Sequence, residues 1–229
     1  EAIAAPTPIS SLVHSSTLVT AGYFLIWLSF YYLSKFLLTS LSLITGFTLL
    51  LASLSALFLS DLKKLVAFST LSQVSLIILT LSLQASTLSL FHIITHALFK
   101  STLFILVGAL LHIRWGAQDS RYLPSYSIPS WVQPLYILPL TNLLGLIFTS
   151  GFLSKELVVL STLSTSPSTI HLLLAVGIIG TTVYTLRIWV HLSVYHPLLT
   201  IPSASDLQLF TPFLVTIFIA LYRGPLYRA

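Results

Sequence analysis

The sequence predicts an all-α fold, a polytopic membrane helix bundle of about six or seven transmembrane helices, and three observations favour it. Hydrophobic residues make up 56% of the 229-residue chain and charged residues only 7%, whereas soluble domains carry about 25% charged residues. The mean hydropathy is +0.99. Apolar runs long enough to cross a hydrocarbon layer of about 30 Å recur along nearly the whole chain. We therefore expect one transmembrane domain over residues 1–229, without a separate soluble catalytic domain.

Short polar connections separate the apolar runs and set the expected helix boundaries. The runs that we expect to cross the membrane are residues 12–33, 37–59, 65–83, 88–111, 131–163, 169–194 and 207–222. The run at 37–59 carries no charge, and we expect it to be lipid-facing scaffold.

The run at 131–163 is too long for one straight crossing. Two prolines and two glycines interrupt it, namely Pro134, Pro139, Gly145 and Gly151. Such residues release backbone groups, which must find partners in protein or in a water-filled cavity. We predict a broken helix near residues 134–160, beside the ionisable pair Lys155 and Glu156, an arrangement typical of ion-handling sites.

Two histidines and a lysine recur at every fourth residue within the run at 88–111. At about 100° per residue these three positions drift only about 80° around a helix and climb about 12 Å. His92, His96 and Lys100 therefore form one ionisable ladder on one helix face. A lysine at membrane depth costs roughly 2.5–3.5 kcal/mol on the insertion scale, so its presence there indicates function.

The other ionisable residues have different expected roles. Those expected to anchor the chain at the membrane interface are Lys35, Lys63, Lys64, Arg114, Arg121, Arg223 and Arg228. His14 by itself fits a satisfied polar residue better than a proton carrier, and Arg187 can extend to the interface. Lys155 follows the predicted helix break, and like Lys100 it points to ion or proton movement.

Proton movement is the chemistry that these residue types favour. Burial destabilises a charged lysine and an approaching carboxylate stabilises it again, so a buried lysine with a movable counter-charge can take up and release a proton. Histidine titrates closest to neutrality and can carry a proton on either ring nitrogen. Lys155 and Glu156 are a candidate half-compensated ion pair, although adjacent helix positions do not face each other.

The sequence excludes or disfavours several other classes of site. The absence of cysteine excludes disulfides, thiolate metal sites and iron–sulfur ligation from this chain. His92 and His96 have a metal-binding spacing, but Ile93 stands where a metalloprotease has glutamate, and the sequence offers no third ligand nearby. The chain contains no GxSxG nucleophile elbow and no Gly-rich phosphate loop. Its net charge of +5 is scattered, so it offers no basic patch for nucleic acid.

Several motifs carry a resemblance to a known family. They are residues 5–22 (APTPISSLVHSSTLVTAG), 61–73 (DLKKLVAFSTLSQ), 91–100 (FHIITHALFK), 118–121 (QDSR), 151–156 (GFLSKE) and 184–187 (YTLR). In this order they closely resemble the chain 5 subunits of mitochondrial NADH–ubiquinone oxidoreductase, respiratory complex I. The resemblance covers roughly residues 1–190, and the first motif separates it from the sister antiporter-like chains 2 and 4.

The resemblance implies a proton-translocating, antiporter-like subunit at the distal end of the membrane arm. Such a subunit couples NADH:ubiquinone oxidoreduction to proton pumping through a buried Lys/His/Glu axis. Matched position by position, the implied proton-transfer residues are His14, Asp61, Lys63, His92, His96, Lys100, Lys155 and Glu156. Glu156 stands where the family usually has aspartate, and the proline usual before Lys155 is absent.

The resemblance also implies partners, cofactors and location. No cofactor is expected in this chain, because NADH, FMN, iron–sulfur clusters and ubiquinone would bind elsewhere in the complex. The expected partners are the neighbouring antiporter-like chain 4, other membrane-arm subunits and membrane lipids in the mitochondrial inner membrane. The family's N-terminal half, with its glutamate–lysine pair, would precede Glu1, so we expect a fragment or a split-gene half whose other half is a separate chain.

Two alternatives stay open at this point. A subunit of a multisubunit Na⁺/H⁺ antiporter shares these motifs and would show sodium-dependent proton flux without NADH. A structural scaffold half of a split subunit would form no channel by itself. Identification of the neighbouring chains in the purified assembly decides between a scaffold and a channel half.

Overall fold

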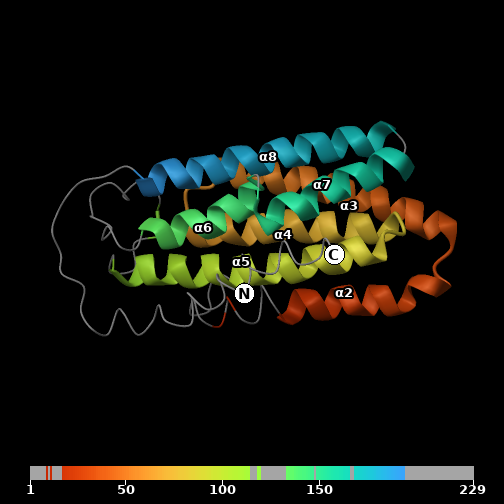
Figure 1. Ribbon diagram of the computed structural model, residues 1–229, viewed down its shortest axis with the longest axis horizontal. Helices are drawn as coiled ribbons and strands as arrows, with labels where there is room; N and C mark the ends of the chain where they lie inside the picture. Colours follow the sequence, from red (N-terminus) through yellow and green to blue (C-terminus); the bar gives the residue numbers. More distant parts are fainter. Residues whose placement is uncertain are drawn as a thin grey trace.

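The computed structural model describes residues 9, 11, 17–113, 118–119, 133–146, 148–165 and 168–193. Its helices run side by side along the long axis of an elongated bundle (Figure 1). They are α2 (Leu18–Ser29), η2 (Phe30–Tyr32), α3 (Lys35–Phe58), α4 (Leu62–Ser82), α5 (Ser86–Ile113), α6 (Gln133–Leu144), α7 (Ser150–Thr165) and α8 (Ser168–Ser193). The predicted all-α membrane bundle is confirmed.

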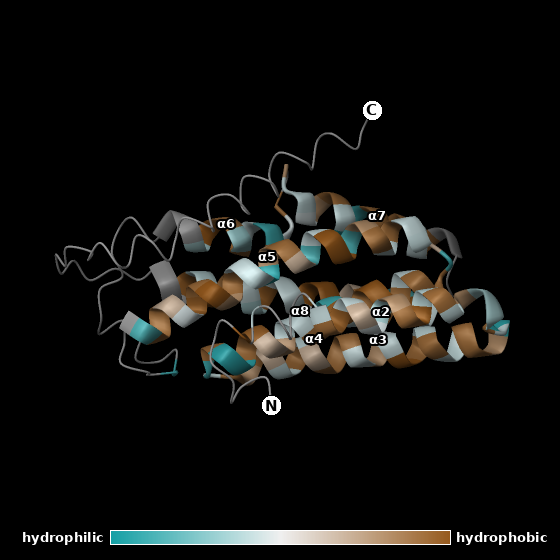
Figure 2. Ribbon diagram, turned by 90° about the horizontal axis from the view of Figure 1, so that it is seen from below, coloured by the Kyte–Doolittle hydropathy of each residue, from teal (hydrophilic) through white to brown (hydrophobic). Residues whose placement is uncertain are grey.

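Four of these helices, α3, α4, α5 and α8, are long and apolar enough to cross a membrane. Their bounds lie within a few residues of the predicted runs, and hydrophobic residues, drawn in brown, recur along their whole length (Figure 2). The helix at 18–32 is apolar but shorter, and α6 and α7 lie end to end (Figure 1). Since the run at 207–222 lies outside the described residues, the number of crossings stays a prediction.

Helix α3 packs against α4 and α8 with a face made mostly of small residues. A Cβ built on Gly177 of α8 would lie 2.6 Å from Cγ of Leu49, and one on Gly180 would lie 2.7 Å from Cβ of Ser53. Glycine thus permits the close approach of α8 to α3, as is typical of helices packed within a membrane. The opposite face of α3 exposes large apolar residues such as Ile44 and Phe47, as expected for scaffold that contacts lipid.

The end of α3 is tied to α8 by Arg187. Its guanidinium donates a hydrogen bond to the carbonyl of Leu57, in the last turn of α3. Such carbonyls have no partner within their own helix, and a cation is favoured at this end of the helix dipole. Arg187 therefore stabilises a helix end within the bundle.

The break between α6 and α7 is short. Gly145 follows α6 with a left-handed φ of 77°, and its N–H donates to the carbonyl of Thr141 at 3.0 Å. The hydroxyl of Thr149 accepts from the N–H of Phe152 at 3.2 Å, which caps the start of α7. Left-handed glycine and a threonine cap are the usual means of ending one helix and starting another.

The predicted broken helix is confirmed, but three of the four residues expected to interrupt it lie inside helices. Pro134 is the second residue of α6, where a helical N–H has no partner in any case. Pro139 lies within α6, which continues through it, and Gly151 lies in the first turn of α7. Only Gly145 lies at the break itself.

Candidate functional site

Helix α5 places three ionisable side chains inside the bundle. His92 and Lys100 are fully buried, and His96 is 1% exposed. The four-residue spacing puts them on one face, which packs against α4, α6 and α7. The predicted ladder therefore faces protein, and its members are withdrawn from lipid.

Lys100 reaches across to α4. Its ammonium donates a hydrogen bond to the hydroxyl of Ser69, which is also buried and itself donates to the carbonyl of Val66 at 2.7 Å. The partner of the buried ammonium is thus a neutral hydroxyl. A carboxylate partner would hold the charge much more firmly.

Lys155 is buried at the broken helix. Its ammonium donates to the carbonyl of Leu143, in the last turn of α6. A Cβ on Gly145 would lie 3.4 Å from Cδ of Lys155, so the lysine stem passes directly over the break. The break exposes an unpaired carbonyl at the negative end of a half-helix, and the lysine occupies that position.

The two helices that carry the lysines are joined by His92 and Ser154. Nδ1 of His92 lies 2.9 Å from the hydroxyl of Ser154, the residue next to Lys155. That hydroxyl also donates to the carbonyl of Gly151 at 3.1 Å. Since the serine proton is directed to Gly151, this geometry fits a His92 that carries its proton on Nδ1 and accepts on Nε2.

Ser154→Ala is expected to lower proton translocation by about fivefold while the complex still assembles, because it leaves a buried imidazole N–H without its partner. Ser154→Thr keeps the hydroxyl and should restore most of the activity. Ser101→Ala is a matched control on α5, since that hydroxyl bonds the carbonyl of Leu98 in its own helix. Proton uptake by reconstituted vesicles measures all three, and equal rates for Ser154→Ala and Ser101→Ala would contradict a role for the His92–Ser154 bond.

The four buried ionisable groups, His92, His96, Lys100 and Lys155, form one electrostatic unit. His92, His96 and Lys100 lie on α5 and Lys155 lies on α7, two helices in direct contact, and charges buried so near one another interact. Within the described part of the chain the one ion pair joins Asp61 and Lys64, so no carboxylate there pairs with either buried lysine. A proton that arrives at one of these groups therefore changes the free energy of holding a proton at the others.

Several buried polar atoms around this unit have no hydrogen-bond partner among the described residues. They are both amide atoms of Gln73 and Nε2 of His92 and of His96. Gln73 is fully buried on α4, one helical turn from Ser69. Buried polar groups are nearly always hydrogen-bonded, and water is the usual partner when side chains supply none.

The buried polar side chains of α4, α5 and α7 form a polar seam that continues to α8. Its residues are Ser69, Gln73, His92, His96, Lys100, Ser154 and Lys155. The hydroxyl of Tyr184, a fully buried residue, lies 3.4 Å from that of Ser72. The sequence gives no sign that Tyr184 meets α4, because that contact depends on how two distant segments pack.

The remaining predicted site residues do not join the buried unit. Glu156 is exposed and makes no ion pair with Lys155, so the predicted half-compensated pair is wrong. Successive residues of a helix point about 100° apart, which sends the two side chains in different directions. His14 lies outside the described residues, and its predicted role stays a prediction.

Asp61 and Lys63 lie at the start of α4, partly exposed. Asp61 pairs with Lys64, one helical turn along, and its backbone bridges to Asp119. Hydrogen bonding from Lys64, and then with Asp119, lowers the pKa of the Asp61 carboxyl. The backbone bridge therefore joins residues 118–119 to the start of α4, and any part that Asp61 and Lys63 play in proton transfer stays a prediction.

The described residues contain no group of three or more histidine, aspartate or glutamate side chains placed to hold a metal ion. Nε2 of His92 and of His96 is buried without a partner among these residues, and the buried lysines at 100 and 155 lie on the same packed helices. This donor set suits proton relay better than metal coordination, because a metal ion would face two cations.

Comparison with known proteins gives consistent matches. The family described as "NADH:quinone oxidoreductase/Mrp antiporter, TM" matches residues 1–181. NADH-ubiquinone oxidoreductase chain 5 of Mytilus edulis is 42% identical over 193 residues, 82% of this chain and 34% of that protein. The Caenorhabditis elegans chain 5 is 44% identical over 160 residues, 69% of this chain and 30% of that protein. The chain thus spans about a third of the length of these relatives.

Two solved structures share the fold. A chain of the membrane-bound sulfane sulfur reductase, an archaeal respiratory membrane complex, gives a TM-score of 0.88 at 21% identity and covers 99% of this chain and 48% of its own. A chain of the Mrp complex from Dietzia sp. DQ12-45-1b gives a TM-score of 0.74 at 24% identity. That match covers 96% of this chain and 25% of the Mrp chain. At these identities the likeness concerns the fold alone.

Proposed function

Since the chain belongs to the NADH:quinone oxidoreductase/Mrp antiporter transmembrane family, we propose that it is a proton-translocating, antiporter-like subunit of respiratory complex I. In this role it contributes to the H⁺-translocating NADH:ubiquinone reductase without redox chemistry of its own. NADH, FMN, iron–sulfur clusters and ubiquinone would bind in other subunits.

One observation carries this proposal: Lys100 and Lys155 are both buried, and each donates to a neutral group. A buried ammonium without a carboxylate partner is costly, and the cost disappears when the ammonium releases its proton. A carboxylate or cation that approaches one lysine changes the free energy of holding a proton there, and it also changes the free energy of holding a proton on the other lysine. The pair can therefore alternate between holding and releasing a proton.

Histidine and water would complete the route. His92 and His96 rise along α5 between the two lysines, and each has a buried Nε2 that no described residue bonds. Water on these nitrogens and on the Gln73 amide would link Lys100 to Lys155 through hydrogen bonds. In this scheme Ser69 orients the ammonium of Lys100 and Ser154 orients the imidazole of His92. The helix break supplies the carbonyl that accepts from Lys155.

The expected surroundings follow from the same proposal. The partners are other membrane-arm subunits, among them the antiporter-like chain 4, and a chain or segment that carries the rest of the relatives' length. The location is the mitochondrial inner membrane, and the described helices belong to a single transmembrane domain within residues 1–229.

The test uses the assembled complex in sealed vesicles, supplied with NADH and ubiquinone. We expect acidification of one compartment that depends on NADH and persists when potassium replaces sodium. Sodium-driven proton flux without NADH would instead show an antiporter, the alternative favoured by the fold shared with the Mrp complex. If a complex without this chain pumped protons at the full rate, the chain would have a structural role only.

A further inference from the structure

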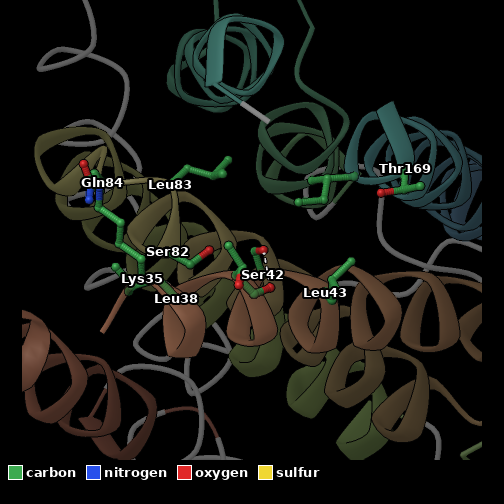
Figure 3. A pocket seen from close by; sticks show the side chains of 10 residues that line it. Lys35, Leu38, Ser42, Leu43, Ser82, Leu83, Gln84 and Thr169 are labelled. Atoms are coloured by element: carbon green, nitrogen blue, oxygen red, sulfur yellow. Dashed lines mark hydrogen bonds between the residues drawn. The ribbon is translucent and has the colours of Figure 1, made fainter. Parts of the chain in front are cut away.

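A pocket of about 400 Å³ opens between the ends of three helices, away from the residues of the candidate site (Figure 3). The first turns of α3, the C-terminal turn of α4 and the start of α8 form its walls. Its volume falls within the range of pockets that bind small ligands, about 300–1,000 Å³.

The pocket lies at the level where the membrane's hydrocarbon layer meets the lipid headgroups. The apolar spans of α3 and α8 begin at Lys35 and Ser168, and that of α4 ends at Ser82. Three spans therefore begin or end around the pocket. Since the length of a span is fitted to the hydrocarbon thickness, these ends mark the interface.

Lys35 is the one charged side chain among the described residues that line the pocket. It lies on the same side as Gln84, with Thr169 on the opposite side (Figure 3). No described residue forms a hydrogen bond or ion pair with the side chains of these three. The lining thus offers a positive charge and amide and hydroxyl donors, which together match an anion.

Gln84 is held in place by its backbone. It adopts a left-handed φ of 67°, its N–H donates to Leu81 at 2.9 Å, and the next N–H donates to Thr80 at 3.2 Å. These bonds satisfy the last carbonyls of α4 in the Schellman arrangement. The amide side chain of Gln84 is therefore presented to the pocket from a fixed turn.

The rest of the lining is largely apolar. Its apolar residues are two leucines of α3, the leucine that follows α4 and an isoleucine of α8, namely Leu38, Leu43, Leu83 and Ile170. A free inorganic anion gains nothing from such walls, whereas an amphipathic molecule places its polar end at Lys35 and its hydrocarbon against the leucines.

We propose that this pocket binds the headgroup of an anionic phospholipid. Lys35 and Gln84 contact the phosphate, the hydroxyl of Thr169 donates a hydrogen bond to a phosphate or glycerol oxygen, and the first carbons of an acyl chain lie against Leu38. The lipid would join the ends of α3, α4 and α8 from outside the proton route. This assignment stands independently of the proposed function, since it uses none of the buried lysines or histidines.

The experiment uses the assembled complex in nanodiscs that contain a photoactivatable phosphatidylglycerol, with cross-linked peptides mapped by mass spectrometry. We expect labelling at the N-terminal turns of α3 and α8. Lys35→Gln should lower it by about fivefold, as expected for the loss of one cationic contact at the membrane surface. Lys64→Gln removes an equal charge elsewhere and should leave labelling unchanged. Thr169→Val serves as a second variant if Lys35→Gln does not assemble, and it should also lower labelling.

Three results would overturn the proposal. Equal labelling by a photoactivatable phosphatidylcholine would show that no anion is selected. Displacement of the lipid probe by millimolar inorganic phosphate would assign the pocket to a free anion. Cross-links from this pocket to a protein segment, with no lipid adduct, would show that another polypeptide fills it. Proton pumping is measured in parallel, and unchanged pumping in Lys35→Gln separates this site from the proton route.

Discussion

Lys100→Met is expected to lower proton translocation coupled to NADH oxidation by about tenfold or more, while the complex still assembles. Methionine has a similar length and an apolar, flexible side chain, so it fills the buried position without a cavity. Ser69 keeps its bond to Val66, and no buried hydroxyl proton is left without an acceptor. The change thus removes one ammonium and little else.

The measurement is the ratio of protons moved to NADH oxidised in sealed vesicles, with assembly checked on a native gel. Lys64→Met is the matched control, because it removes a lysine from the exposed Asp61–Lys64 pair at the start of α4. Exposed ion pairs contribute about 0–1 kcal/mol, so the control should pump and assemble like the unmodified chain. A fully assembled Lys100→Met complex with an unchanged ratio would remove Lys100 from the proton route.

Gly151→Ala is expected to destabilise the chain by about 3–5 kcal/mol, enough to deplete the assembled complex. A Cβ at this position would lie 1.9 Å from the carbonyl oxygen of Asn142 and 2.9 Å from its carbonyl carbon. Both obstacles are backbone atoms of α6, so a side-chain rotation cannot relieve the clash. The start of α7 would have to move away from the end of α6, and Lys155 would lose its contact with Leu143.

Gly22→Ala on α2 provides the control, since a Cβ there meets no atom within 4 Å. Alanine has a higher helix propensity than glycine by about 1 kcal/mol, so this variant should assemble as well as the unmodified chain or slightly better. The readout is the amount of assembled complex and its midpoint of thermal dissociation. Equal midpoints for the two glycine variants would contradict the close packing of α6 on α7.

The sequence sufficed to predict those features of the fold and of the site that depend on position within a single helix. The four-residue spacing of His92, His96 and Lys100 sufficed to place them on one face, because that geometry belongs to the α-helix itself. Long apolar runs likewise predicted α3, α4, α5 and α8 to within a few residues, since membrane thickness dictates their length. The broken helix near residues 134–160 was also expected, and it corresponds to α6 and α7.

What could not be predicted depends on which helices pack together. Neither the bond from Lys100 to Ser69 nor that from Lys155 to Leu143 has any sequence signal, because each joins segments whose relative placement is set by the whole bundle. Counting every proline and glycine as an interruption placed too many breaks near 134–160. Pro139 is tolerated inside α6, while Gly145 ends it by adopting a left-handed conformation that costs glycine no steric strain.

The most direct test of a hydrated, proton-carrying seam is a density map of the assembled complex at a resolution that shows ordered water. We expect water at the amide of Gln73 and at Nε2 of His92 and His96, in a hydrogen-bonded series that reaches from Lys100 to Lys155. A dry, apolar interior between the two lysines, with their ammoniums joined to nothing but Ser69 and Leu143, would contradict proton transfer along this axis.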